Sequence, residues 1–224
     1  MNATPIEPNP ALELFSYFRS SSSYRVRIAL HLKGLSYSYK SIHLLRDGGE
    51  QHQDTYSGLN PLREVPSLRH GELVLAQSMA ILTYLDQLFP TPALFPQEAS
   101  AKALVVQACE IINSGTQPLQ NLGVLQKLGK DFSATEEQRQ AWSKYWIERG
   151  LRAFETLIQP HSGQFCFSDT VTAADLYLVP QLFNARRFAV ELEQFPLIQK
   201  IEAHCLKLEA FTQAEPSLQP DAGA

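Results

Sequence analysis

Ser20-Ser-Ser-Ser-Tyr-Arg-Val-Arg-Ile-Ala-Leu30 joins a strand-like run to an amphipathic helical stretch. The preceding run, 12–17, reads Leu-Glu-Leu-Phe-Ser-Tyr and predicts a strand. The pattern after the serines predicts a helix over 24–33, ended by Gly34. A hydroxyl-rich turn between a strand and a helix directs hydroxyls, backbone N–H groups and the positive helix end toward one point. Such a point suits an anion, for example the thiolate of a bound thiol.

Composition narrows the class of protein. The chain has 224 residues, of which 44% are hydrophobic and 19% charged, with a formal net charge of −4. This length allows one large domain or two small ones, and the charge disfavours general binding to nucleic acid or to an anionic membrane. No apolar run reaches the roughly 18 residues that span a bilayer. Residues 1–10 lack the basic start and apolar stretch of a signal peptide, so we expect a cytoplasmic protein that binds neither nucleic acid nor membrane.

The cysteines and histidines predict neither a disulfide framework nor a metal site. Cys109, Cys166 and Cys205 are odd in number, widely spaced and outside any Cys-x-x-Cys pair. The six histidines show no metal-ligand spacing. We therefore predict no metal.

Strand and helix signals alternate over the first ninety residues, and helical signals alone follow. The predicted early elements after the first helix are a strand over 35–44, a short helix over 50–57, a hairpin of 65–68 and 73–75, and a helix over 78–88. Pro90, Pro92 and Pro96 mark a linker. The later predicted helices span 99–128 with a kink at Pro118, 135–159, 172–187 and 196–210, before a polar surface tail over 215–224. In the 135–159 helix the candidate core residues are Trp142, Trp146, Leu151, Phe154 and Leu157.

This pattern predicts an α/β thioredoxin-like N-terminal domain followed by an all-α C-terminal domain. The boundaries are 10–90 for the first domain, 91–98 for the linker and 99–224 for the helical domain.

Two local motifs each allow a structural and a functional interpretation, and a third favours the structural one. Val65-Pro66 is either a cis peptide turn or an ordinary strand start. Ser78, after Gln77, is a helix cap or part of a carboxylate site. Thr172 with Asp175 resembles a capping box and carries no catalysis.

Several short motifs occur in a fixed order that resembles the zeta class of glutathione transferases. They are the 20–30 stretch, Asn60-Pro61, Val65-Pro66, Gln77-Ser78, Gln117-Pro-Leu-x-Asn121, Asn184-Ala-x-Arg-Phe188 and Gln219-Pro-Asp221. The resemblance runs from about Leu12 to Asp221. The first motif with the Gln-Pro-Leu segment is specific to that class, whereas Val-Pro and Gln-Ser mark the wider superfamily.

The resemblance implies glutathione as cofactor and gives each candidate residue a role. Ser20 and Ser21 would be catalytic and hold the thiolate, and Arg187 would be catalytic by meeting a substrate carboxylate, with Arg19 and Arg25 as helpers. The implied cofactor contacts are Ser20, Ser21, Ser22, Gln51, Val65, Pro66, Gln77, Ser78, Gln117, Asn121, Leu122 and Gly123.

The activity implied is glutathione-dependent conversion of maleylacetoacetate, a small keto acid with a cis double bond, to fumarylacetoacetate in tyrosine and phenylalanine breakdown. Thiolate addition, bond rotation and elimination would carry it out. The resemblance also implies a homodimer. Some zeta enzymes have Cys at Ser22 and Trp at Tyr24, and Ser22 weakens the case for transferase or dehalogenase activity. Open alternatives are a maleylpyruvate isomerase, a general transferase or dehalogenase, and a non-catalytic glutathione-transferase-like binding module.

Overall fold

The computed structural model describes residues 11–223, so the N-terminal segment examined for a signal peptide lies outside the described residues. The chain divides into two compact units. The first contains the described residues up to Leu85 together with those from Gln213 onward, and the second is Asp86–Thr212. None of the helices in the described range combines the length and apolar character needed to cross a membrane.

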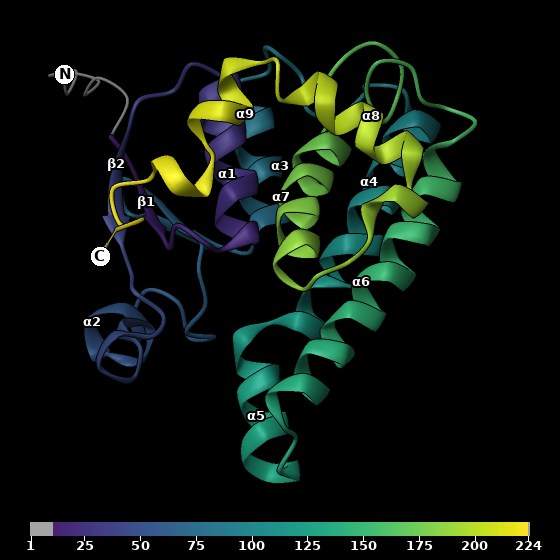
Figure 1. The fold of residues 1–224 in the computed structure, drawn as a ribbon. Coiled ribbons are helices and arrows are strands. Elements are labelled where there is room, and N and C mark those ends of the chain that lie inside the picture. Colours follow the sequence, from purple (N-terminus) through teal and green to yellow (C-terminus); the bar gives the residue numbers. More distant parts are fainter. Residues whose placement is uncertain (1–10, 224) are drawn as a thin grey trace, which may run out of the picture. The chain divides into compact units, whose positions relative to one another are not determined.

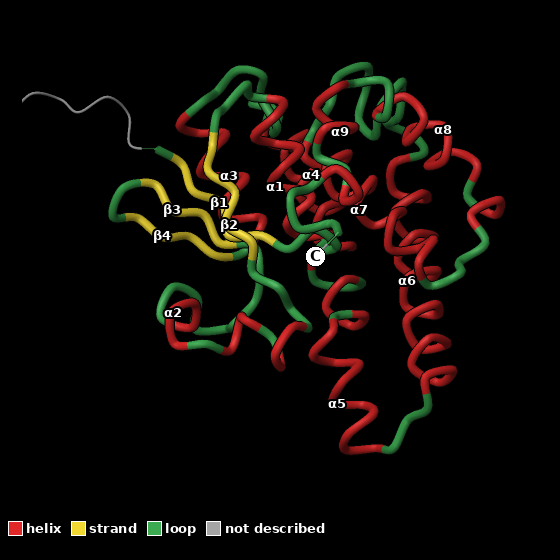
Figure 2. The backbone as a smooth tube through the Cα atoms, turned by 60° about the vertical axis from the view of Figure 1, so that its left-hand side comes forward, coloured by secondary structure: helices red, strands yellow, loops and turns green. Residues whose placement is uncertain are grey.

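A four-stranded mixed sheet forms the centre of the first unit (Figure 2). The strands are β1 (Leu12–Ser16), β2 (Tyr37–Ser41), β3 (Ser67–His70) and β4 (Leu73–Ala76). Their order is β2-β1-β3-β4; β1 runs parallel to β2 and antiparallel to β3, and β3 and β4 form a hairpin. Leu14 of the central strand β1 is fully buried, opposite Tyr39 on one side and Leu68 on the other.

The first unit also contains the helices α1 (Ser21–Leu32) and α3 (Ser78–Leu88), and the single-turn helix α2 (Asp54–Ser57) precedes β3. Helix α1 makes the crossover that two parallel neighbouring strands require. Figure 1 shows α1 and α3 side by side, and both bury aliphatic side chains, including Ile28 and Leu82. The βαβ and ββα order confirms the predicted thioredoxin-like fold of this part of the chain.

Several element boundaries differ from the sequence prediction. Helix α1 begins at Ser21, three residues before the predicted start, because Ser20 occupies the N-cap position, where serine is favoured. The second strand is shorter than predicted, and β3 begins at Ser67, after the Val65-Pro66 turn. That peptide bond is cis, which confirms one of the two interpretations of this motif.

The second unit is helical, in agreement with the predicted class. Its helices are α4 (Ala99–Asn113), α5 (Leu122–Phe132), α6 (Glu136–Ile158), α7 (Ala173–Arg187), α8 (Pro196–Cys205) and α9 (Glu209–Gln213), whose last residue is assigned to the first unit. A single helix over 99–128 is wrong: a 3-10 helix, Gln117–Gln120, separates α4 from α5 and carries Pro118, which cannot donate a helical hydrogen bond. The predicted 196–210 helix likewise divides into α8 and α9.

The core of the second unit confirms part of the predicted set. Leu151 and Phe154 of α6 are fully buried, whereas Trp142, Trp146 and Leu157 are only partly buried. The three residues are therefore wrong as core predictions. The two indole rings contact each other edge to face, with ring centroids 5.7 Å apart.

The C-terminal tail is wrong as part of the helical domain, and the surface prediction is only partly right, because Leu218 is exposed whereas Pro216, Gln219 and Asp221 are buried. From Gln213 onward the chain belongs to the first unit, and Figure 1 shows its end beside β1 and β2. Asp221 is only 5% exposed because its carboxylate accepts hydrogen bonds from Phe18, Tyr39 and Ser41 of that unit. The polar composition of the tail gave no sign of this packing, because the buried polar side chains, Gln219 and Asp221, are satisfied by hydrogen bonds.

Candidate active site

The β1–α1 turn places Ser20 at the positive end of a helix. The backbone N–H of Ser20 donates to the Tyr17 carbonyl oxygen at 3.0 Å, and its side-chain oxygen accepts the N–H of Ser23 at 3.2 Å. Accepting this bond leaves the hydroxyl hydrogen able to be donated to an anion. The partly exposed Ser20 therefore combines a donor with the field of a twelve-residue helix.

Ser21 carries a buried hydroxyl that lacks a protein partner. It is 3% exposed, and its oxygen makes no hydrogen bond within the described part of the chain. A buried unpaired hydroxyl is costly unless a ligand or water satisfies it. Ser22, the next residue, is partly exposed. The predicted helper Arg19 donates from Nη2 to the Tyr17 hydroxyl at 3.0 Å.

The start of α3 lies next to the first turns of α1. Nη1 of Arg25, a fully buried α1 residue, donates to the Ser78 side-chain oxygen at 3.0 Å. Gln77 precedes the helix with φ of 69°, in the left-handed region that glutamine rarely adopts, and is exposed. The N-terminus of α3 therefore carries the Ser78 hydroxyl, which Arg25 fixes in place, and the Gln77 side chain on a strained backbone.

The peptide before Val65 is fixed by two side chains from the segment preceding β3. The Glu64 carbonyl oxygen accepts from the Tyr56 hydroxyl at 2.5 Å and from Nδ2 of Asn60 at 2.7 Å. Tyr56 and Asn60 are both buried, and burial raises the pKa of the Tyr56 hydroxyl, so it remains a donor. Val65 and the following Pro66 are thereby held in one geometry.

Gln51 lies in a buried position with one unused acceptor. Its Nε2 donates to the Leu44 carbonyl oxygen at 3.3 Å, while Oε1 makes no hydrogen bond to any described residue. A Cβ at Gly49, where φ is 103°, would lie 2.5 Å from Gln51 Nε2. Glycine at this position is therefore what admits the Gln51 side chain.

These parts of the first unit share one apolar cluster. Its buried members are Phe15, Tyr17, Tyr56 and Val65, with Phe18, Ile42, Leu44 and Leu59 packed against them. Tyr17 stands at the turn that leads to Ser20, and Leu44 holds Gln51. The structure thus connects the segments of Ser20, Gln51 and Val65, and Arg25 connects α1 with Ser78.

In the second unit, the predicted residues Gln117, Asn121, Leu122 and Gly123 form one short stretch. Asn121 caps α5 by accepting the N–H of Leu122 at 2.8 Å. Nε1 of Trp142 donates to the Leu119 carbonyl oxygen at 2.7 Å, which fixes the preceding 3-10 helix. Gly123 is exposed with open space at its Cβ position.

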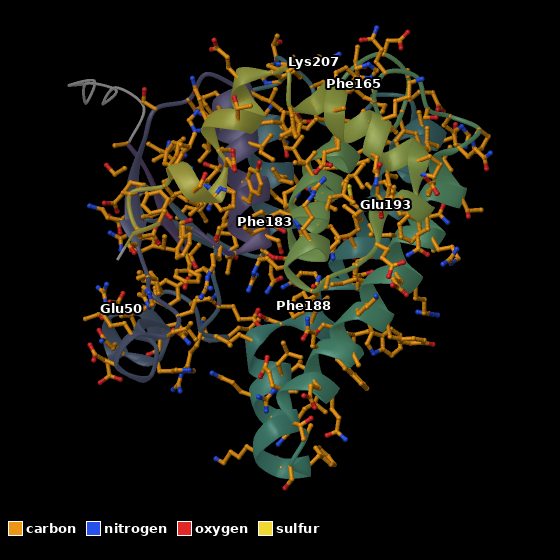
Figure 3. All side chains as sticks on the ribbon, in the orientation of Figure 1. Glu50, Phe165, Phe183, Phe188, Glu193 and Lys207 are labelled. Carbon is orange, nitrogen blue, oxygen red and sulfur yellow. The ribbon has the colours of Figure 1, made fainter. Side chains whose placement is uncertain are left out.

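Arg187 is the last residue of α7 and is exposed (Figure 3 labels the following Phe188). Its Nη1 donates to Oδ1 of Asn184 at 3.2 Å, and its guanidinium lies 5.7 Å from the Phe188 ring centre. Farther back on α7, Gln181 accepts at Oε1 from Nε2 of Gln120, 2.9 Å away. This bond joins the stretch before α5 to the helix that carries Arg187.

Asp175 has the structural role predicted for it. Its carboxylate accepts the N–H groups of Thr172 and Cys166, both at 2.8 Å. Cys166 and Cys205 are buried nearby, and burial is the main cause of the raised pKa of each thiol. A thiol kept neutral in this way is a poor nucleophile.

Sequence reasoning assigned no role to several residues that support the site. Tyr56, Asn60 and Asp221 hold its peptide groups, and buried Arg27 donates to backbone carbonyls in the same unit. The available signals were the motifs that contain Asn60 and Asp221, and the two arginines in an otherwise apolar helical stretch, because arginine is rarely fully buried without partners.

Comparison with known proteins agrees with this geometry. Residues 10–87 match the family model described as the glutathione S-transferase N-terminal domain. The chain is 43% identical over 209 residues to the maleylacetoacetate isomerase of Dictyostelium discoideum, covering 93% of this chain and 95% of the relative.

Two solved structures are similar over nearly the whole chain. One, described as the holo structure of a maleyl pyruvate isomerase, a bacterial glutathione S-transferase in the zeta class, has a TM-score of 0.91 and 42% identity and covers 94% of this chain and 99% of its own. The other is the maleylacetoacetate isomerase of Anaeromyxobacter dehalogenans with bound glutathione, with a TM-score of 0.85, 42% identity and coverage of 96% and 100%.

Proposed function

Because this chain belongs to the zeta-class glutathione transferase family, we propose that it converts maleylacetoacetate to fumarylacetoacetate with glutathione as its cofactor. The observation that carries the proposal is Ser20, whose hydroxyl stands at the N-terminus of α1 with its hydrogen able to meet a thiolate. The relatives named above as isomerases support the choice of reaction.

Two buried polar atoms fit glutathione as the ligand of the first unit. The Ser21 hydroxyl and Oε1 of Gln51 are buried without a partner among the described residues. Glutathione offers a sulfur atom and amide N–H groups, which are the partners these atoms require. Gln77 and Ser78 would hold its γ-glutamyl carboxylate, and the Val65 backbone would pair with its cysteinyl unit.

Bound glutathione supplies a thiolate that adds to the cis double bond, permits rotation and is then expelled. The protein must raise the ionised fraction of a thiol whose ordinary pKa is about 8.5. Lowering that pKa by about 2 units requires about 2.7 kcal/mol. A charge-assisted bond from the Ser20 hydroxyl contributes about 1.5–3 kcal/mol, and the helix end about 0.3–1 kcal/mol. Together they contribute about 1.8–4 kcal/mol, a range that includes the required value.

Substrate recognition requires a cation, for which we propose Arg187. A guanidinium binds a carboxylate through two parallel hydrogen bonds, and Arg187 is exposed at the end of α7. Gln117, Asn121, Leu122 and Gly123 are proposed to contribute polar and open surface to the bound ligands. We further propose a homodimer in the cytoplasm, which sedimentation and cell fractionation test.

The experiment is to follow the cis-enone absorbance of maleylacetone with the protein, with and without glutathione. Isomerisation that requires both supports the proposal, and parallel assays with maleylpyruvate rank the keto acids. Turnover of α-haloacids without isomerisation selects a transferase or dehalogenase instead. Glutathione binding with no turnover of any of these substrates selects a non-catalytic module.

A further inference from the structure

The carboxylate of Asp221 is bonded to the backbone of the turn that leads to Ser20. Its Oδ2 accepts the Phe18 backbone N–H at 3.0 Å and the Ser41 hydroxyl at 3.2 Å, and its Oδ1 accepts the Tyr39 hydroxyl at 2.7 Å. Asp221 is 203 positions from Phe18 in sequence, yet Phe18 stands two residues before Ser20.

Arg27 holds the other side of the same turn. Its Nη2 donates to the Phe18 carbonyl oxygen at 3.1 Å, and its Nη1 to the Ser16 hydroxyl at 3.2 Å. Its Nε donates to the Ala214 carbonyl oxygen at 3.0 Å, so the C-terminal segment is bonded to this residue as well. Arg27 is fully buried, so these hydrogen bonds compensate its guanidinium for the lost contact with water.

The Phe18 residue is therefore held by a cation at its C=O and an anion at its N–H. The adjacent Tyr17 carbonyl oxygen accepts the Ser20 N–H, so displacing this turn displaces Ser20. Hydrogen bonds to charged groups are stronger than neutral ones, and each removed partner would leave a partly buried peptide group unpaired.

We propose that Asp221 is a positioning residue of the thiol site, which sets the Phe18 peptide so that the Ser20 hydroxyl points at the sulfur of bound glutathione. This inference rests on the proposed function. The Tyr39 hydroxyl binds the other carboxylate oxygen, Oδ1, and burial raises the pKa of that phenol and keeps it a donor at neutral pH. The other charged or titratable groups at this turn are Arg27, Arg19, whose guanidinium lies 5.3 Å from the Phe18 ring centre, and His43, whose ring centre lies 5.1 Å from that of Tyr17.

The test is Asp221→Asn, read by the ultraviolet absorbance of the bound glutathione thiolate as a function of pH. Asparagine keeps the shape but loses the charge and one acceptor. We expect the pKa of bound thiol to rise and turnover near pH 7 to fall by about 10- to 100-fold, since a 1 Å misplacement of a catalytic group can cost about 100-fold. The KM for glutathione should change much less than kcat.

Tyr39→Phe is the matched control, since it removes one bond to Asp221 and leaves the Phe18 contact in place. It should lower the melting temperature but leave the pKa of bound thiol unchanged. An unchanged thiol pKa in Asp221→Asn overturns the proposal. An equal rise in Tyr39→Phe also overturns it, because general docking of the tail would then be the cause.

The double variant Ser20→Ala/Asp221→Asn shows whether Asp221 acts through Ser20. We expect Asp221→Asn to cost nothing further in the Ser20→Ala background, and a full additional loss overturns the proposal. If Ser20→Ala by itself leaves the thiol pKa unchanged, the proposed function fails at Ser20, which is a distinct result. Should Asp221→Asn not fold, Asp221→Glu keeps the charge but displaces the acceptor, and a wild-type thiol pKa there overturns the proposal.

Discussion

Arg25 donates from Nη1 to the Ser78 hydroxyl oxygen at 3.0 Å and so joins the first turns of α1 and α3. The guanidinium is fully buried, and its charge lies beside the N-terminus of α3. A buried cation and a helix N-terminus both favour an anion, and here they act on the same hydroxyl. This arrangement suits the carboxylate end of the cofactor.

Replacing Ser78 with alanine should weaken glutathione binding more than it slows turnover. Loss of a hydrogen bond to a charged group costs about 1.5–3 kcal/mol, which corresponds to a rise of about 10- to 100-fold in the KM for glutathione. Steady-state kinetics with varied glutathione measure this. Ser114→Ala, at an exposed serine after α4, is the matched control. A lower kcat with unchanged KM would contradict the assignment.

Replacing Ser20 with alanine should reduce turnover far more than glutathione binding. Without the hydroxyl, the pKa of bound thiol moves toward its ordinary value of about 8.5, so the pH profile of kcat shifts upward. The measurement is the rate of maleylacetone isomerisation across pH at saturating glutathione. Full activity in Ser20→Ala would refute the assignment and make Ser21, with its buried unpaired hydroxyl, the next candidate.

Replacing Arg187 with lysine should raise the KM for the keto acid about tenfold, since lysine cannot form the paired hydrogen bonds of a guanidinium. Glutathione binding should not change. The adjacent Arg186 offers a matched control, because it is exposed and its Nη1 pairs with Oε1 of Glu202 at 2.7 Å. Equal effects of Arg186→Lys and Arg187→Lys would show a general charge effect and contradict a specific role.

We expect His31, near the end of α1, to make stability depend on pH. Burial, with a smaller effect of Arg27, lowers its pKa below 6.5. As pH falls below about 6.5, the unfolded chain takes up the proton first, so stability present at neutral pH is lost. His31→Gln should flatten the unfolding free energy between about pH 7.5 and 5, measured by urea titration. The exposed His161→Gln should keep the wild-type slope, and an unchanged slope in His31→Gln would contradict the account.

The fold was predictable where local pattern and packing agree. The alternation of strand and helix signals, with the amphipathic helix after Ser20, predicts the thioredoxin-like domain. The capping box at Thr172 predicts the start of α7. Division of the 99–128 region was not predictable from periodicity, because the apolar pattern resumes at Leu122 after the 3-10 helix.

Motifs predicted single site residues, with Arg25 among them as a helper, but not the buried hydrogen bonds that hold these residues in place. Arg25, Arg27 and Asp221 are charged and buried, and periodicity assigns charged residues to the surface. Their partners lie far away in sequence, as with Asp221 and Phe18. The left-handed φ of Gln77 also has no sequence signal, because glutamine does not favour that region.

The most direct test of glutathione acting as a cofactor is to count thiols during turnover. Maleylacetone in large excess over glutathione is incubated with the protein, and both the trans product and the free thiol are quantified. The account predicts many product molecules per glutathione with the thiol concentration unchanged. Loss of one thiol for each substrate consumed, or equal isomerisation without glutathione, would contradict it.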